Sequence, residues 1–113
     1  MYWLDPFKGG EEYELKTTST CSVTEGRGDY ISGLQKGNVD FESCKLECSK
    51  YHWCHGIIIG DNNGLCRLLT EEEEELSGWT FFNYGNWVEP NQWKNGRSSL
   101  HRCFEKKINP FEG

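Results

Sequence analysis

Apolar positions in the middle of the chain have helical spacing. Four of them recur at intervals of three and four residues, which places them on one helical face: Phe41, Cys44, Cys48 and Tyr51. Asp40 is a favourable N-cap, and Glu42 in the first turn suits the helix dipole. The pattern therefore predicts one helix that begins near Asp40 and ends between Ser49 and His52.

Segments with strand-like composition surround this helix. They cover residues 30–35, 54–59, 65–69, 79–84 and 100–106. Residues 60–64 read Gly-Asp-Asn-Asn-Gly, a strong turn signal, so the second and third segments are expected to form a hairpin. One helix with several antiparallel strands predicts an α+β fold.

Composition narrows the class of protein. The 113 residues fit one domain, and only 35% of them are hydrophobic, so the core must use the 16 aromatic side chains. The net charge of −6 argues against a nucleic-acid partner. No apolar run approaches the ~18 residues that would span a bilayer, so membrane insertion is not expected.

Cysteine content is the strongest single signal. An even number of cysteines in a small polar domain indicates disulfides and an oxidising compartment: Cys21, Cys44, Cys48, Cys54, Cys66 and Cys103. Six cysteines allow about 15 pairings, and spacing alone does not choose among them. Their positions on the expected elements favour three pairs, namely Cys44–Cys66, Cys48–Cys54 and, for the two ends, Cys21–Cys103.

Three segments carry a family resemblance. Residues 40–48 read Asp-Phe-Glu-Ser-Cys-Lys-Leu-Glu-Cys, residues 53–54 read Trp-Cys, and residues 64–69 read Gly-Leu-Cys-Arg-Leu-Leu. Together with an outer pair at Cys21 and Cys103, they resemble the PAN/apple family over about residues 21–103, although 79–93 departs from the pattern. The resemblance implies one helix packed on a curved antiparallel sheet, disulfide-stapled, and a module that binds proteins or carbohydrates outside cells without catalysis.

This interpretation sets the expected boundaries. Residues 1–20 are expected to be an N-terminal extension, 21–107 the PAN/apple-like domain and 108–113 a C-terminal tail. The first 20 residues lack the basic start and apolar stretch of a signal peptide, so we expect that a leader has been removed from a secreted, extracellular chain.

A tripeptide in the glycine-rich segment after Cys21 is a candidate receptor-binding site. Arg27, Gly28 and Asp29 form the Arg-Gly-Asp sequence that integrin-type receptors read. Such receptors pair the arginine with carboxylates and let the aspartate complete the coordination of a metal. The alternative is a coincidental match, with Asp29 held in a buried salt bridge.

Six aromatic residues crowd a short stretch and suggest a second candidate site: Trp79, Phe81, Phe82, Tyr84, Trp87 and Trp93. Most are expected in the core. Trp87 and Trp93 lie in a loop-like stretch and are expected to be exposed, where with Asn86 and Asn91 they would form a glycan-binding site.

The glutamate run, the histidines and the Ser98–His101 pair do not predict a functional site. The run of five glutamates from Glu71 to Glu75 is expected to be a solvated segment. His52, Cys54 and His55 fit no common zinc spacing, and the proximity of Ser98 to His101 does not make a catalytic triad. No cofactor, metal or enzymatic activity is expected.

The sequence therefore predicts an extracellular binding module for protein–protein interaction or adhesion, with an integrin-type receptor as one candidate partner. A lectin-like glycan-binding domain and a structural module of a larger extracellular protein are the alternatives.

Overall fold

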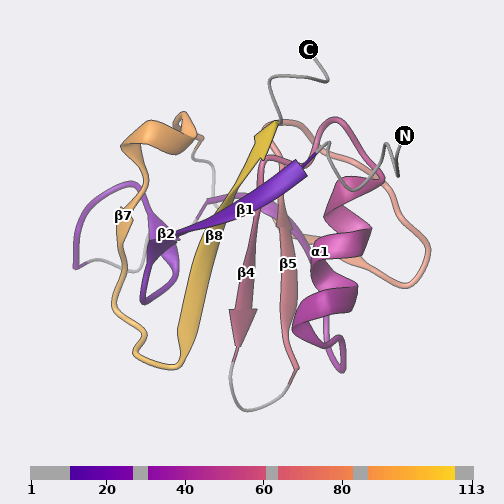
Figure 1. The fold of residues 1–113 in the computed structure, drawn as a ribbon, viewed down its shortest axis with the longest axis horizontal. Coiled ribbons are helices and arrows are strands. Elements are labelled where there is room, and N and C mark those ends of the chain that lie inside the picture. Colours follow the sequence, from indigo (N-terminus) through magenta and orange to yellow (C-terminus); the bar gives the residue numbers. More distant parts are fainter. Residues whose placement is uncertain (1–10, 27–30, 61–63, 83–86, 109–113) are drawn as a thin grey trace, which may run out of the picture.

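The computed structural model describes residues 11–26, 31–60, 64–82 and 87–108, and within them one α-helix packs on an antiparallel sheet (Figure 1). The helix is α1 (Phe41–Ser49). The sheet has the order β1 (Glu11–Thr17), β8 (His101–Ile108), β4 (Gly56–Gly60), β5 (Cys66–Leu69), β3 (Gly33–Lys36) and β6 (Thr80–Phe82). A separate pair is formed by β2 (Cys21–Ser22) and β7 (Lys94–Asn95), and a short 3-10 helix, η2, covers Pro90–Gln92. This is the predicted α+β arrangement.

The helix begins where the sequence predicts. Asp40 is the N-cap, and its Oδ1 accepts a hydrogen bond from the backbone N–H of Ser43 at 2.8 Å. This bond lowers the pKa of Asp40, because it stabilises the charged carboxylate. The side chain thus satisfies one of the backbone donors that a helix N-terminus leaves open.

Each predicted strand segment overlaps an observed strand. β4 and β5 form the expected antiparallel hairpin, with Ile57 opposite Leu68. The observed strands β3, β4 and β6 begin one to three residues later than the predicted segments.

One strand was not predicted. β1 lies inside the expected extension 1–20, yet it pairs with β8 from Glu11 opposite Ile108 to Thr17 opposite Cys103. Tyr13 connects this strand to the helix, since its hydroxyl donates to the Lys45 carbonyl at 3.0 Å. Residues 11–17 therefore belong to the sheet, and β8 continues to Ile108, one residue beyond the expected domain boundary.

Two hydrophobic clusters lie on opposite faces of the sheet, because successive side chains of a strand point to opposite sides. The helix-side cluster comprises Leu34, Cys44, Cys48, Cys54, Ile57, Ile59, Cys66 and Leu68. The far-side cluster comprises Cys21, Ile31, Ile58, Leu69, Trp93 and Cys103.

All six cysteines form disulfides, in the same three pairs that the sequence analysis favours. Cys44–Cys66 joins α1 to β5, and Cys48–Cys54 joins the end of α1 to the segment before β4. Cys21–Cys103 joins β2 to β8 across 82 residues. The cross-links therefore fix both the helix and the two ends of the chain to the sheet.

Candidate functional site

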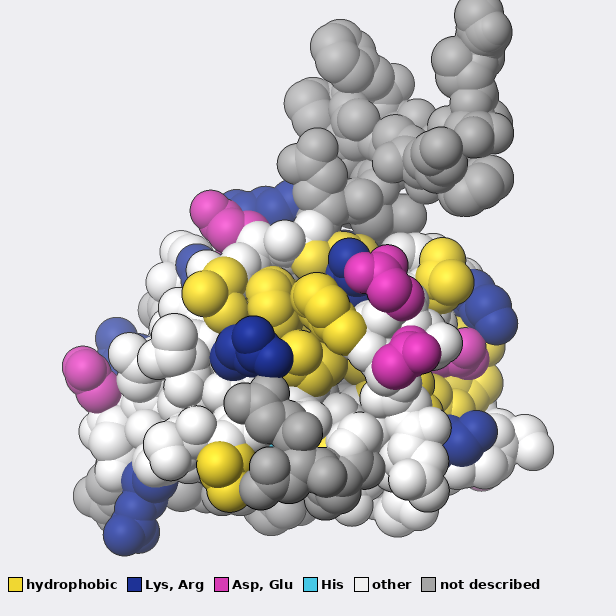
Figure 2. Space-filling view, turned by 60° about the horizontal axis from the view of Figure 1, so that its bottom comes forward, with side chains coloured by type: hydrophobic (Ala, Val, Ile, Leu, Met, Phe, Trp, Pro, Cys, Tyr) yellow, Lys and Arg dark blue, Asp and Glu magenta, His cyan; other side chains and the backbone are white. Residues whose placement is uncertain are grey.

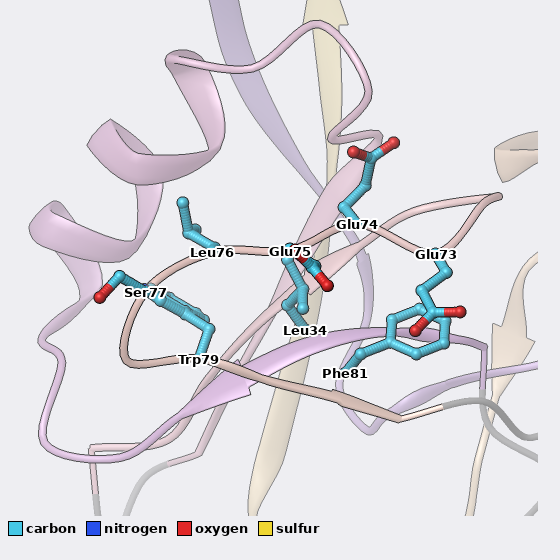
Figure 3. Close-up of a pocket in the computed structure, with 8 residues that line it drawn as sticks. All are labelled: Leu34, Glu73, Glu74, Glu75, Leu76, Ser77, Trp79 and Phe81. Carbon is cyan, nitrogen blue, oxygen red and sulfur yellow. The ribbon is translucent and has the colours of Figure 1, made fainter.

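The loop between β5 and β6 forms one wall of a groove. Because the strand order is β5-β3-β6, this connection must pass over β3, and it does so above Leu34 (Figure 3). The hollow has a volume of about 490 Å³. We call it the acidic groove, and it is lined by Leu34, Glu73, Glu74, Glu75, Leu76, Ser77, Trp79 and Phe81.

The floor of the acidic groove is apolar and belongs to the sheet. Leu34 of β3 lies directly opposite Phe81 of β6 in the strand register. Phe81 and Trp79 are half-buried and pack against the helix-side cluster. The floor is thus continuous with the core.

A tight turn places Trp79 at the end of the groove. The backbone N–H of Trp79 donates to the Leu76 carbonyl at 3.0 Å. Gly78 has a φ of 86°, a left-handed conformation that glycine adopts without steric cost. The turn places the indole in the groove lining, next to Ser77 and directly before β6 begins (Figure 3).

The rim of the groove carries carboxylates. Figure 3 shows Glu73 and Glu75 directed toward the floor and Glu74 directed away from it. This alternation is expected of an extended segment, in which successive side chains point to opposite sides. Glu73 and Glu75 are exposed, and the residues that line the groove include no lysine or arginine.

A second hollow of about 350 Å³ lies on the other side of Trp79. It is lined by Lys36, Asn38, Val39, Asp40, Ser43, Glu47, Ser77 and Trp79. The Lys36 ammonium is 5.9 Å from the centre of the Trp79 ring, within the range of a cation–π interaction. Trp79 therefore separates a hollow that holds a cation from a groove that has none in its lining.

The predicted sites have different outcomes. Arg27, Gly28 and Asp29 lie outside the described residues, as does Asn86. Asn91 is exposed in η2. Trp93, expected to be exposed, is instead 6% exposed and belongs to the far-side cluster.

Gly56 explains why Trp93 is buried. A Cβ atom at Gly56 would lie 2.8 Å from the Trp93 ring and 2.5 Å from the Phe104 carbonyl oxygen. The missing side chain creates a space on β4 that the indole fills, and the Trp93 Nε1–H donates to the Val88 carbonyl at 3.0 Å. Trp87 packs edge-on against Trp93, so this pair is not the exposed sugar-stacking surface that was expected.

Sequence reasoning missed the acidic groove. It treated the glutamate run as a solvated segment and the neighbouring aromatic residues mainly as core. The available signal was their combination, since alternate glutamates at 73 and 75 precede the aromatic residues Trp79 and Phe81 by only a few positions.

Histidines occupy separate environments. His55 is half-buried against Trp87, with ring centres 5.0 Å apart, and burial lowers its pKa, whereas Glu71 and Glu89 oppose that shift. The thiol of the neighbouring Cys54 is in a disulfide and cannot act as a metal ligand. His101 shares a hydrogen bond with Ser98, whose hydroxyl also accepts from the Leu100 backbone N–H.

Hydrophobic side chains also gather on another part of the surface, between basic and acidic side chains (Figure 2). Leu15 of β1 is 48% exposed and lies opposite Phe104 of β8. The Phe104 ring is 4.9 Å from that of Phe41 on α1. We call Leu15, Phe41 and Phe104 the apolar face.

Comparisons of the chain with known protein families, with curated proteins and with solved structures found no match. In the described part of the chain, no helix is long and apolar enough to cross a membrane.

Proposed function

We propose that the protein is a secreted binding module of the PAN/apple type, which binds a protein partner in the acidic groove. The observation that carries this proposal is the pairing of an apolar floor, Leu34, Trp79 and Phe81, with a carboxylate rim on an exposed loop. An apolar floor supplies affinity through burial, and charged groups at a rim supply orientation and partner choice.

The framework around the groove supports this role. Lys36 of β3 lies opposite Cys66 of β5, so the Cys44–Cys66 disulfide fixes the strand beside the groove floor. Small disulfide-dense domains are typical of secreted proteins. A rigid sheet that presents a variable loop is a common arrangement for recognition.

A protein partner is favoured over a glycan by the chemistry of the lining. The glycan interpretation relied on an exposed Trp87–Trp93 pair, and Trp93 is buried. Among the described residues, the lining of the acidic groove offers three carboxylates. Carboxylates on an apolar floor suit a polypeptide that carries both cationic and aliphatic groups.

Selection from a phage-displayed peptide library tests the proposal. We expect sequences to be enriched on the native protein but not on the variant Trp79→Ala/Phe81→Ala. Leu15→Ala/Leu46→Ala is the matched control, since it removes apolar side chains away from the groove and should retain the enrichment. Near-ultraviolet circular dichroism checks that each variant is folded.

Three outcomes would overturn the proposal. Equal enrichment on the native protein and the groove variant would place binding elsewhere. Binding on a glycan array with no peptide enrichment would favour the lectin-like alternative. Absence of both would favour a structural module.

Integrin recognition through Arg27, Gly28 and Asp29 is a separate prediction. If the tripeptide is recognised, Asp29→Glu should abolish the adhesion of integrin-bearing cells, because the longer side chain displaces the carboxylate from the receptor's metal. Adhesion equal to that of the native protein would show that the tripeptide has no such role.

A further inference from the structure

We infer that the occupant of the acidic groove is an extended segment of the partner protein, with lysine or arginine at alternate positions, which pairs with strand β6. This inference rests on the proposed function and names the chemistry of the partner. It combines three observations, namely the charge of the rim, the spacing of its carboxylates and the position of β6 in the sheet.

The charge of the groove selects a cationic occupant. Glu73, Glu74 and Glu75 all line the groove, and the lining that the structure describes holds no lysine or arginine. Ion pairs with Glu73 and Glu75 would form over the apolar floor. The aliphatic stems of lysine or arginine would cover that floor while their charged ends reach the rim.

The spacing of Glu73 and Glu75 favours an extended conformation of the occupant. Glu73 and Glu75 are two residues apart in an extended segment and point to the same side (Figure 3). Side chains on one face of a β-strand also recur every second residue, roughly 7 Å apart. Cations at alternate positions of a strand would therefore meet the two carboxylates in register.

Strand β6 provides the backbone partner. It is the last strand of the six-stranded sheet in the part of the chain that the structure describes, where β3 is its neighbour. The other edge of a terminal strand presents N–H and C=O groups that an added strand can pair with. A strand added there would direct alternate side chains to the face that carries Phe81.

Trp79 adds a site for a cation at the end of the groove. Its ring already lies near the Lys36 ammonium on the side of the second hollow. The indole is also part of the groove lining, beside the three glutamates. A lysine or arginine of the occupant can therefore contact the indole there without displacing Lys36.

Fluorescence anisotropy with a labelled nonapeptide of alternating lysine and valine tests the inference. We expect this peptide to bind and a peptide of alternating glutamate and valine to bind at least tenfold more weakly. Glu73→Gln/Glu75→Gln should weaken binding by about tenfold, because two rim ion pairs are lost. Glu71→Gln/Glu72→Gln removes the same charge from the same loop outside the groove lining, and should change affinity by less than about twofold.

Backbone methylation tests the strand pairing. Two further peptides carry backbone N-methyl groups, one peptide on all lysines and the other on all valines. In a strand paired with β6, the N–H groups of only one of these two residue types point toward β6. We expect one methylated peptide to lose binding and the other to keep it. Unchanged binding of both would overturn the strand geometry.

Other outcomes separate this inference from the proposed function. Equal weakening by the two glutamate pairs would show a general effect of charge and overturn the inference. A library selection that depends on Trp79 and Phe81 but enriches acidic or neutral peptides would overturn the inference while leaving the proposed function intact.

Discussion

The two faces of the sheet are stabilised by different means. On the helix side, α1 and two disulfides that close segments of 22 and 6 residues bring together parts of the chain that are near in sequence. On the far side, one disulfide spans 82 residues, and Trp93 fills the space above Gly56. The comparison shows that the cross-links on the helix side close short segments of chain, whereas the cross-link on the far side closes most of the chain.

The acidic groove lies on the helix side of the sheet. Its floor continues into the helix-side cluster through Leu34. Variants of the rim should therefore change binding without changing stability, whereas variants of the far side should change stability first.

Removal of the long-range disulfide should have the largest effect. Loop-closure entropy predicts that Cys21→Ala/Cys103→Ala lowers the free energy of unfolding by roughly 4–5 kcal/mol, and Cys48→Ala/Cys54→Ala by only roughly 2 kcal/mol. Urea denaturation of the two variants measures the difference. Equal losses, or a larger loss for the short cross-link, would contradict the contrast between the two faces.

Two tryptophans distinguish the core from the groove. Trp93→Ala should lower the free energy of unfolding by about 3–5 kcal/mol, since it leaves a cavity against Gly56. Trp79→Ala should lower the free energy of unfolding by about 1 kcal/mol or less, because the Trp79 ring is half-buried and borders a hollow on each of two sides. Similar losses at both positions, measured by urea denaturation, would show that Trp79 is a structural residue.

The C-terminus of the helix depends on a lysine from the sheet. Lys106 Nζ donates to the carbonyls of Cys48 at 3.1 Å and Tyr51 at 2.9 Å, where the helix dipole favours a cation. Lys106→Met should lower the free energy of unfolding by about 1–2 kcal/mol. Lys107→Met, at an exposed neighbouring position, is the control; it removes only exposed ion pairs with Glu14 and Glu105 and should lower the free energy of unfolding by less than Lys106→Met does. Equal stability of both variants would show that Lys106 does not stabilise the C-terminus of the helix.

A modest pH dependence should come from His55. Burial lowers its pKa below the ordinary value of 6.5, so the unfolded chain binds a proton at a higher pH than the folded protein does. This contribution to stability is complete above pH 6.5 and is lost as the pH falls through the folded pKa. His55→Gln should reduce the change in the thermal unfolding midpoint with pH over that range. The exposed control His52→Gln should have the same pH dependence of the midpoint as the native protein. An unaltered curve for His55→Gln would contradict the assignment.

Local signals explain how much of this molecule could be predicted. The Asp40 cap, the helical spacing of Cys44 and Cys48 and the turn signal at 60–64 act over a few residues, and they predicted the helix, the hairpin and the two short cross-links. The Cys21–Cys103 pair was predicted only because these two cysteines remained. The burial of Trp93 depends on Gly56, which is 37 positions away, so no local pattern revealed it. Strand β1 was missed for the same reason, because in the described part of the chain it pairs with β8, which lies near the other end of the sequence.

The candidate site was less predictable than the fold. The glutamate run and the aromatic residues are visible in the sequence, but the groove exists only because the β5–β6 connection crosses β3. Strand order is a long-range property, and without it Glu73 and Glu75 could not be placed over Leu34 and Phe81.

Nuclear magnetic resonance titration tests the central claim most directly. The lysine–valine peptide is added to ¹⁵N-labelled protein, and changes in amide and indole shifts are mapped along the chain. The account predicts the largest changes at Leu34, Glu73, Glu75, Phe81 and the Trp79 indole. Largest changes on the apolar face, at Leu15, Phe41 and Phe104, would contradict it.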